Sequence, residues 1–121
     1  MKIGFIGMGN MAKAIIAGLL QNEIVKPQDI IGSSATQKTA DSVKEQFGIE
    51  TCLDNCRVAK EADVLFLAVK PQFFAQVIGQ IKEVVPEDKP VISIAAGKTI
   101  DYIENYVPQK IDIVKTRGLE N

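Results

Sequence analysis

A glycine-rich segment near the start of the 121-residue chain has the spacing of a dinucleotide-binding loop. Residues 7–12 read Gly-Met-Gly-Asn-Met-Ala and fit the pattern G-x-G-x-x-G/A. In that pattern the first glycine permits a tight turn, the second leaves room for a pyrophosphate, and the small third residue lets the helix approach the strand. The amides at the start of the helix would then face the phosphates. Because glycines also close ordinary turns, a purely structural turn is the alternative.

The segment after the second predicted strand bears on which dinucleotide is bound. An NAD site usually has Asp or Glu there, which hydrogen-bonds the ribose hydroxyls and would repel a 2′-phosphate. Residues 32–38 instead read Gly-Ser-Ser-Ala-Thr-Gln-Lys, and no acid occurs before Asp41. The hydroxyls of Ser33 and Ser34, with Lys38, suit a phosphate, so NADP(H) is favoured over NAD(H). The alternative is a solvated Ser/Thr loop that caps the next helix, and since serine is a preferred cap, both interpretations can hold together.

Three other segments follow predicted strands and belong to the carboxyl edge, where open α/β sheets bind ligands. Asn55 follows the third strand and either caps a helix or contacts the adenosine end of a cofactor. Lys70, in the segment 68–72 after the fourth strand, is either a ligand contact or a solvated lysine. The small residues of 93–97 either let a flat ring approach the backbone or serve packing alone.

The order of apolar segments predicts the fold that positions these residues. Short apolar strands alternate with helical patterns, and strands joined by helical crossovers form a parallel sheet covered on both faces. We therefore expect an α/β protein: one three-layer α/β/α domain over 1–114 with a Rossmann-type doubly wound parallel sheet, then a tail over 115–121. The strand at 63–69 is expected to be buried on both faces. Strands are expected at 3–6, 29–32, 49–53, 63–69, 91–95 and 111–114, and helices at 11–20, 36–47, 58–62, 71–85 and 100–106.

Composition excludes several classes of function. The chain has no His, which rules out a His-dependent nucleophile and any His-ligated metal, so no metal is expected. Cys52 and Cys56 match neither a C-x-x-C motif nor a zinc set, and we expect reduced thiols in a cytoplasmic protein. The 14 Lys and Arg against 15 Asp and Glu do not indicate nucleic acid as a partner. No signal peptide or membrane span is expected, because no apolar run approaches about 20 residues.

Taken together, the motifs resemble the N-terminal half of the pyrroline-5-carboxylate reductase family. The resemblance covers residues 1 to about 114 and rests on the segments 4–12, 33–34, 55, 68–72 and 93–97 at these separations. It implies an oxidoreductase of proline biosynthesis, which reduces the C=N bond of 1-pyrroline-5-carboxylate with NADPH to give L-proline. The cofactor supplies the hydride, and the protein supplies position and electrostatics.

The resemblance also implies cofactor contacts along the loops that follow the strands. These serve, in order, the pyrophosphate, the 2′-phosphate, the adenosine ribose and the nicotinamide half of the cofactor. The residues are Ile6, Gly7, Met8, Gly9, Asn10 and Met11; then Ser33 and Ser34; then Asn55; then Ala68, Val69, Lys70 and Pro71 together with Ile94, Ala95 and Ala96.

The chain departs from the family after the sixth predicted strand. The family continues with a Met-Pro-Asn-Thr-Pro segment and a helical domain that builds the dimer and binds the substrate, whereas residues 114–121 read Val-Lys-Thr-Arg-Gly-Leu-Glu-Asn. No catalytic residue is therefore assigned. We interpret the chain as the cofactor-binding portion of the reductase, which acts on 1-pyrroline-5-carboxylate if the second domain is supplied. The alternative is a non-catalytic NADP-binding module or a truncated gene product. Apolar residues near the end, Val107, Ile111 and Ile113, would favour a homo-oligomer.

Overall fold

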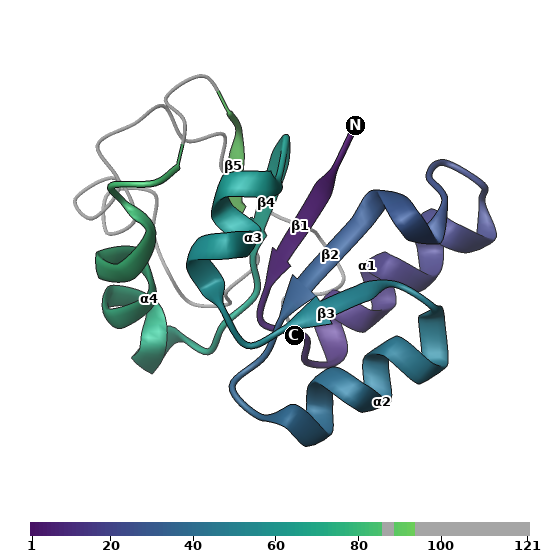
Figure 1. Cartoon of the computed structure of the whole chain (residues 1–121), viewed down its shortest axis with the longest axis horizontal. Helices are drawn as coiled ribbons and strands as arrows, with labels where there is room; N and C mark the ends of the chain where they lie inside the picture. Colours follow the sequence, from purple (N-terminus) through teal and green to yellow (C-terminus); the bar gives the residue numbers. More distant parts are fainter. Residues whose placement is uncertain (86–88, 94–121) are drawn as a thin grey trace.

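The computed structural model describes residues 1–85 and 89–93 (Figure 1). Its strands are β1 (Ile3–Ile6), β2 (Ile30–Ser33), β3 (Glu50–Cys52), β4 (Val64–Leu67) and β5 (Val91–Ser93). Its α-helices are α1 (Asn10–Gln21), α2 (Gln37–Phe47), α3 (Asn55–Glu61) and α4 (Phe74–Ile81), with short 3-10 helices η1 (Pro27–Asp29) and η2 (Pro71–Phe73). The predicted alternation of strands and helices is confirmed over these residues.

The strands form one parallel sheet in the order β3-β2-β1-β4-β5. β1 lies at its centre, where Ile3 is in register with Ile30 of β2 and with Val64 of β4. The chain first builds outward from β1 to β3 and then crosses to the other side of β1 to form β4 and β5. The strand order therefore reverses between β1 and β4, and the loops after these two strands diverge, which is where open α/β sheets bind ligands.

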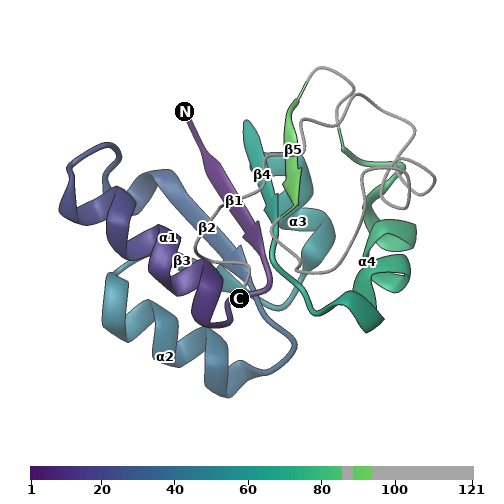
Figure 2. The same cartoon turned by 180° about the vertical axis from the view of Figure 1, so that it is seen from behind.

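Helices cover both faces of the sheet (Figures 1 and 2). On one face α1 and α2 pack over a buried cluster that includes Phe5, Ile16 and Val43. On the other face α3 and α4 pack over a second cluster that includes Ile6 and Ile78. Neighbouring residues of β1 point to opposite clusters, because side chains alternate along a strand. The doubly wound, Rossmann-like α/β/α arrangement predicted from the sequence is confirmed.

Several helix boundaries differ from the predicted ones, most of all those of α3 and α4. α3 begins at Asn55 rather than at residue 58, because the Asp54 carboxylate accepts hydrogen bonds from the amides of Cys56 and Arg57 and so caps the helix earlier. The helix predicted at 71–85 begins with the 3-10 helix η2 at Pro71, and its α-helical part, α4, runs from Phe74 to Ile81, short of the predicted residue 85. Gly48 ends α2 as predicted, with a left-handed backbone at φ 72°.

The strand predicted at 63–69 is shorter and less buried than expected. In β4, Leu65 and Leu67 are buried, whereas Val64 and Phe66 are partly exposed, so the expectation of burial on both faces was wrong. The reason is that α1 and α2 cover the β1–β3 side of that face, and no helix of the described part lies over β4 there (Figure 2). The Phe66 ring instead stacks on Phe5, with ring centroids 4.8 Å apart.

Several sequence predictions fall outside the described residues. These are the helix at 100–106, the strand at 111–114, the tail at 115–121 and the apolar residues Val107, Ile111 and Ile113. Across the described ranges, no helix has the length and apolar character needed to cross a bilayer.

Candidate functional site

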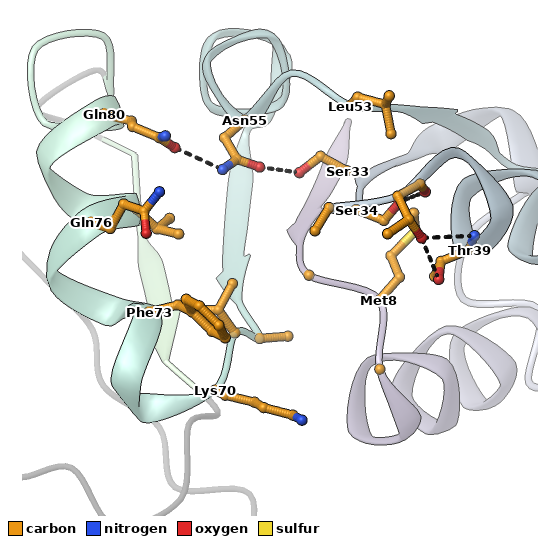
Figure 3. A pocket seen from close by; sticks show the side chains of 17 residues that line it. Met8, Ser33, Ser34, Thr39, Leu53, Asn55, Lys70, Phe73, Gln76 and Gln80 are labelled. Carbon is orange, nitrogen blue, oxygen red and sulfur yellow. Dashed lines mark hydrogen bonds between the residues drawn. The ribbon is translucent and has the colours of Figure 1, made fainter.

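A pocket of about 670 Å³ lies at the carboxyl edge of the sheet, where the strand order reverses (Figure 3). The loops after β1 and β2 form one side, and the segment after β4 together with α4 forms the other. The predicted cofactor contacts that line it are Gly7, Met8, Gly9, Ser33, Ser34, Asn55, Ala68, Val69 and Lys70. Residues distant in the sequence thus meet at one site, as the parallel sheet requires.

The other predicted contacts do not line this pocket. Ile6 is fully buried in the core at the end of β1, and Asn10 and Met11 belong to the first turn of α1 beside the loop. The backbone of Pro71 begins η2. Ile94, Ala95 and Ala96 lie outside the described residues.

The two loop glycines serve different purposes. Gly7 has φ 93°, and a Cβ there would come within 2.6 Å of the Ala68 carbonyl oxygen, so both the turn and the close approach need glycine. The Gly7 amide also donates to the Ser33 carbonyl oxygen at 2.9 Å, which ties the loops after β1 and β2 together. Gly9 is different, since no atom of the described residues lies within 4 Å of an added Cβ. The space beside Gly9 is therefore open to a ligand.

The N-terminus of α1 at this loop has no side-chain cap. Its N-cap residue is Gly9, and no side chain of residues 1–85 or 89–93 accepts a hydrogen bond from the first-turn amides. By contrast, α2 is capped by the Thr36 hydroxyl, which accepts from the Thr39 amide, and α3 is capped by Asp54. The free amides of α1, at the positive end of the helix dipole and next to the open space, suit an anionic group such as a pyrophosphate.

The two serines after β2 are both engaged within the protein. Ser33 is fully buried, and its hydroxyl donates to Asn55 Oδ1 at 2.7 Å. Ser34 is 8% exposed, and its hydroxyl donates to the Thr36 carbonyl oxygen at 2.7 Å. The predicted capping of the next helix by this Ser/Thr loop is confirmed, and the residue that caps α2 is Thr36 rather than either serine. Of the two, Ser34 is the one that reaches the protein surface.

Asn55 joins three elements across the top of the pocket (Figure 3). It is the first residue of α3, and since Asp54 caps the helix, the alternative of an Asn55 cap is wrong. While Oδ1 accepts from Ser33, the amide Nδ2 donates to Gln80 Oε1 on α4 at 2.9 Å. A continuous row of hydrogen bonds therefore runs from β2 through α3 to α4.

Lys70 supplies the charge at the pocket. Among the described residues that line it, Lys70 is the only charged one, and its exposed side chain extends toward the cavity (Figure 3). Within the described part of the chain, its ammonium group has no acidic partner. An unpaired cation near a helix N-terminus favours an anionic ligand.

Several lining residues were not predicted. On α4 and η2 they are Phe73, Gln76, Val77 and Gln80, and on the opposite side they are Ala35, Thr36, Thr39 and Leu53. Phe73 and Leu53 are large apolar side chains that remain 49% and 51% exposed at the pocket. The sequence signal for the α4 set was a second helical face at spacings of 3 and 4, next to the buried face that begins at Phe74.

The acidic and cysteine side chains are the candidate metal ligands and disulfide partners within the described part of the chain. No group of three or more Cys, Asp or Glu side chains there is placed to hold a metal ion. Cys52 and Cys56 are both free thiols, and Cys56 Sγ contacts the Gln80 carbonyl oxygen at 3.3 Å.

Comparisons with known proteins agree with this geometry. Residues 2–97 match the family model described as "NADP oxidoreductase coenzyme F420-dependent". The chain is similar to pyrroline-5-carboxylate reductase from Methanosarcina acetivorans, with 35% identity over 114 residues that cover 94% of this chain and 42% of that protein.

Solved structures show the same relationship. The pyrroline-5-carboxylate reductase of Coxiella burnetii superposes with a TM-score of 0.86 at 37% identity, over 94% of this chain and 42% of that one. The pyrroline carboxylate reductase of Plasmodium falciparum, solved with NADP bound, superposes with a TM-score of 0.82 at 27% identity, over 95% of this chain and 42% of that one. The chain therefore spans about two fifths of the length of these relatives.

Proposed function

The chain belongs to the family described as "NADP oxidoreductase coenzyme F420-dependent", and we propose that it is the cofactor-binding portion of a pyrroline-5-carboxylate reductase. The observation that carries the proposal is the pocket at the strand reversal. There the open space beside Gly9 meets the N-terminus of α1 and the ammonium of Lys70, neither of which has a side-chain partner among the described residues. This combination suits a bound dinucleotide with a central pyrophosphate.

We propose that different segments of the pocket bind different groups of the cofactor. The first-turn amides of α1 bind the pyrophosphate, and the Gly9 backbone lets it approach. The loop after β2 faces the adenosine ribose, while Ala68 and Val69 after β4 form the wall toward the nicotinamide half. The bound nicotinamide supplies a hydride to the C=N carbon of the substrate, and the chain's own residues bind and orient it.

We also propose NADP(H) rather than NAD(H) as the preferred cofactor. No Asp or Glu lines the described part of the pocket, so no carboxylate there would repel a 2′-phosphate. Ser34 and the neighbouring loop residues Ala35 and Thr36 form the wall where that phosphate would lie. The NADP-bound structure of the Plasmodium falciparum relative supports the same assignment.

The substrate and the setting belong to the proposal as well. The substrate is 1-pyrroline-5-carboxylate, which is reduced to L-proline when a substrate-binding domain completes the site. Free Cys52 and Cys56 fit a reducing compartment, so we place the protein in the cytoplasm.

A second candidate is a cofactor-binding module without catalysis. It is favoured by the pocket lining, in which Lys70 is the one titratable side chain among the described residues. A pocket so lined holds a dinucleotide but offers little for proton transfer to a substrate.

The test combines binding with turnover. Fluorescence titration of the chain with NADPH should give saturable binding, and NADPH with 1-pyrroline-5-carboxylate should give L-proline once the substrate domain of a relative is added. Absence of dinucleotide binding would contradict the proposed function. Binding without turnover, even with the added domain, would favour the non-catalytic module.

A further inference from the structure

Asn55 is held from two sides, and this fixes what it can offer to a ligand. Its Oδ1 accepts from the buried Ser33 hydroxyl at 2.7 Å, and its Nδ2 donates to Gln80 Oε1 at 2.9 Å. Figure 3 shows Asn55 between these partners at the top of the pocket that it lines. Because both ends of the amide are engaged, rotation of the side chain would break both hydrogen bonds.

The Asn55 amide retains one hydrogen-bond donor and one acceptor, which together form a matched pair. A primary amide has two N–H donors and two lone pairs on its oxygen. Ser33 takes one lone pair and Gln80 takes one N–H, which leaves one donor and one acceptor. Within the described residues neither of these has a protein partner, so both are available to a ligand in the pocket.

The location of this pair indicates what it meets. In NAD sites a carboxylate at the end of the second strand accepts hydrogen bonds from the adenosine ribose. Here the end of β2 is Ser33, which is fully buried and whose hydroxyl donates a hydrogen bond to Asn55 Oδ1. Asn55, which accepts from Ser33 and is less buried, therefore extends this position toward the pocket, beside Ser34.

We propose that Ser33 and Gln80 are positioning residues that orient Asn55 to bind a vicinal diol, the 2′,3′-hydroxyls of an adenosine ribose. A diol offers one donor and one acceptor to a matched pair, whereas a 2′-phosphate offers acceptors only and can use just the N–H. The clamp formed by Ser33, Asn55 and Gln80 thus supports NADH more than NADPH, and it limits the preference for NADPH. This inference rests on the proposed binding of a dinucleotide in the pocket.

The experiment measures the dissociation constants of NADH and NADPH for variants at Gln80. Gln80→Leu removes the acceptor for Nδ2 while keeping a side chain of similar volume. We expect it to weaken NADH about fivefold, the effect of one hydrogen bond, and NADPH by about twofold or less. Gln80→Glu keeps an acceptor, so NADH affinity should stay within about twofold of the unchanged chain.

Gln76 provides the matched comparison, because it lies one turn earlier on α4, lines the same pocket and makes no hydrogen bond to Asn55. Gln76→Leu should leave the ratio of the two dissociation constants unchanged. Ser33→Ala should shift the ratio in the same direction as Gln80→Leu, and a thermal unfolding curve checks that this buried variant folds.

The outcomes separate the two proposals. If the unchanged chain binds neither dinucleotide, the proposed function fails. If it binds both, and Gln80→Leu changes the two dissociation constants equally or not at all, the clamp is overturned while the proposed function stands. A selective loss of NADH with Gln80→Leu, restored with Gln80→Glu, supports the clamp.

Discussion

The two edges of the sheet differ in how their polar groups are used. At the amino edge, charged side chains pair with one another: Lys2 Nζ lies 3.5 Å from Glu50 Oε1, and Arg57 contacts both Glu50 and Glu61. At the carboxyl edge, the first-turn amides of α1 and the ammonium of Lys70 have no such partners within the described residues. The amino edge is satisfied internally, and the carboxyl edge leaves its polar groups to a ligand.

Asp63 illustrates the amino edge. It lies just before β4, accepts from the Lys2 backbone amide at 2.7 Å and from Lys89 Nζ at 3.0 Å, and so joins the starts of β1 and β4 to the chain ahead of β5. The backbone hydrogen bond from Lys2, followed by the hydrogen bond and charge of Lys89, lowers the pKa of the Asp63 carboxyl. Changes at the carboxyl edge should therefore affect cofactor binding, and changes at the amino edge should affect stability.

The largest expected effect comes from filling the open space at the carboxyl edge. Gly9→Val adds a side chain where no atom of the described residues lies within 4 Å of a Cβ, so the fold should tolerate it. The valine side chain would occupy the space through which a pyrophosphate approaches the backbone. We expect NADPH affinity to fall at least about 100-fold, roughly 2.7 kcal/mol, as measured by fluorescence titration. Gly18→Val on the same helix, also with open space, is the control and should bind normally. Equal binding by both variants would remove the loop from the site.

A Gly7 variant tests whether the loop at the carboxyl edge also contributes to the stability of the fold. Gly7→Ala puts a side chain at φ 93° and within 2.6 Å of the Ala68 carbonyl oxygen, so it should lower the free energy of unfolding by about 2 kcal/mol. Gly48→Ala, at φ 72° with no atom within 4 Å of the added Cβ, should have a smaller effect. Urea denaturation of both variants measures the difference, and a smaller loss at Gly7 than at Gly48 would contradict the close approach.

A Lys70 variant tests whether the positive charge at the carboxyl edge contributes to cofactor binding. Lys70→Met removes the charge but keeps an apolar stem, and we expect the dissociation constants of NADPH and NADH to rise about fivefold at low salt, with a smaller increase at high salt. The free energy of unfolding should change by less than about 0.5 kcal/mol, because an exposed lysine is removed. Lys60→Met, on the exposed side of α3, serves as the control, and a loss of cofactor affinity there would indicate a general charge effect.

The smallest effect is expected at the amino edge. Because the folded state lowers the pKa of Asp63 from its ordinary value of 3.8, its stabilising contribution is present above about pH 3.8 and is lost as the pH falls through the lower, folded-state value. Asp63→Asn should therefore flatten the decline in stability below pH 4 while leaving NADPH affinity unchanged. Urea denaturation between pH 2.5 and 7 provides the measurement, with Asp29→Asn as control. An unchanged acid limb would contradict the role of Asp63.

Local sequence was sufficient for much of the fold and for one half of the site. The glycine loop is a continuous stretch between a strand and a helix, so Gly7, Gly9 and Ala12 could be assigned to a turn, an open space and a close packing position from their spacing alone. Ala12 is indeed fully buried against β1 and its neighbours. The same local logic predicted the parallel sheet, because each short apolar run was followed by a helix.

The other half of the site depends on residues far apart in the chain. Helical spacing groups Gln80 with its neighbours on one face of α4, but it cannot reveal the contact of Gln80 with Asn55, 25 residues earlier. Phe73 was hidden for a similar reason, because the apolar pattern of α4 identifies the buried face that begins at Phe74 but not the neighbouring face that meets the pocket.

The sequence by itself determined the succession of strands and helices, the glycine loop and the absence of histidine chemistry, since composition and short-range periodicity are written along the chain. Only the tertiary structure decided that the Ser33 hydroxyl is buried and serves Asn55, that Asp54 and Thr36 rather than their neighbours cap the helices, and that α4 completes the pocket. The physical reason is that a hydroxyl or an amide has several possible partners of similar energy, and packing selects among them by bringing one within hydrogen-bond distance.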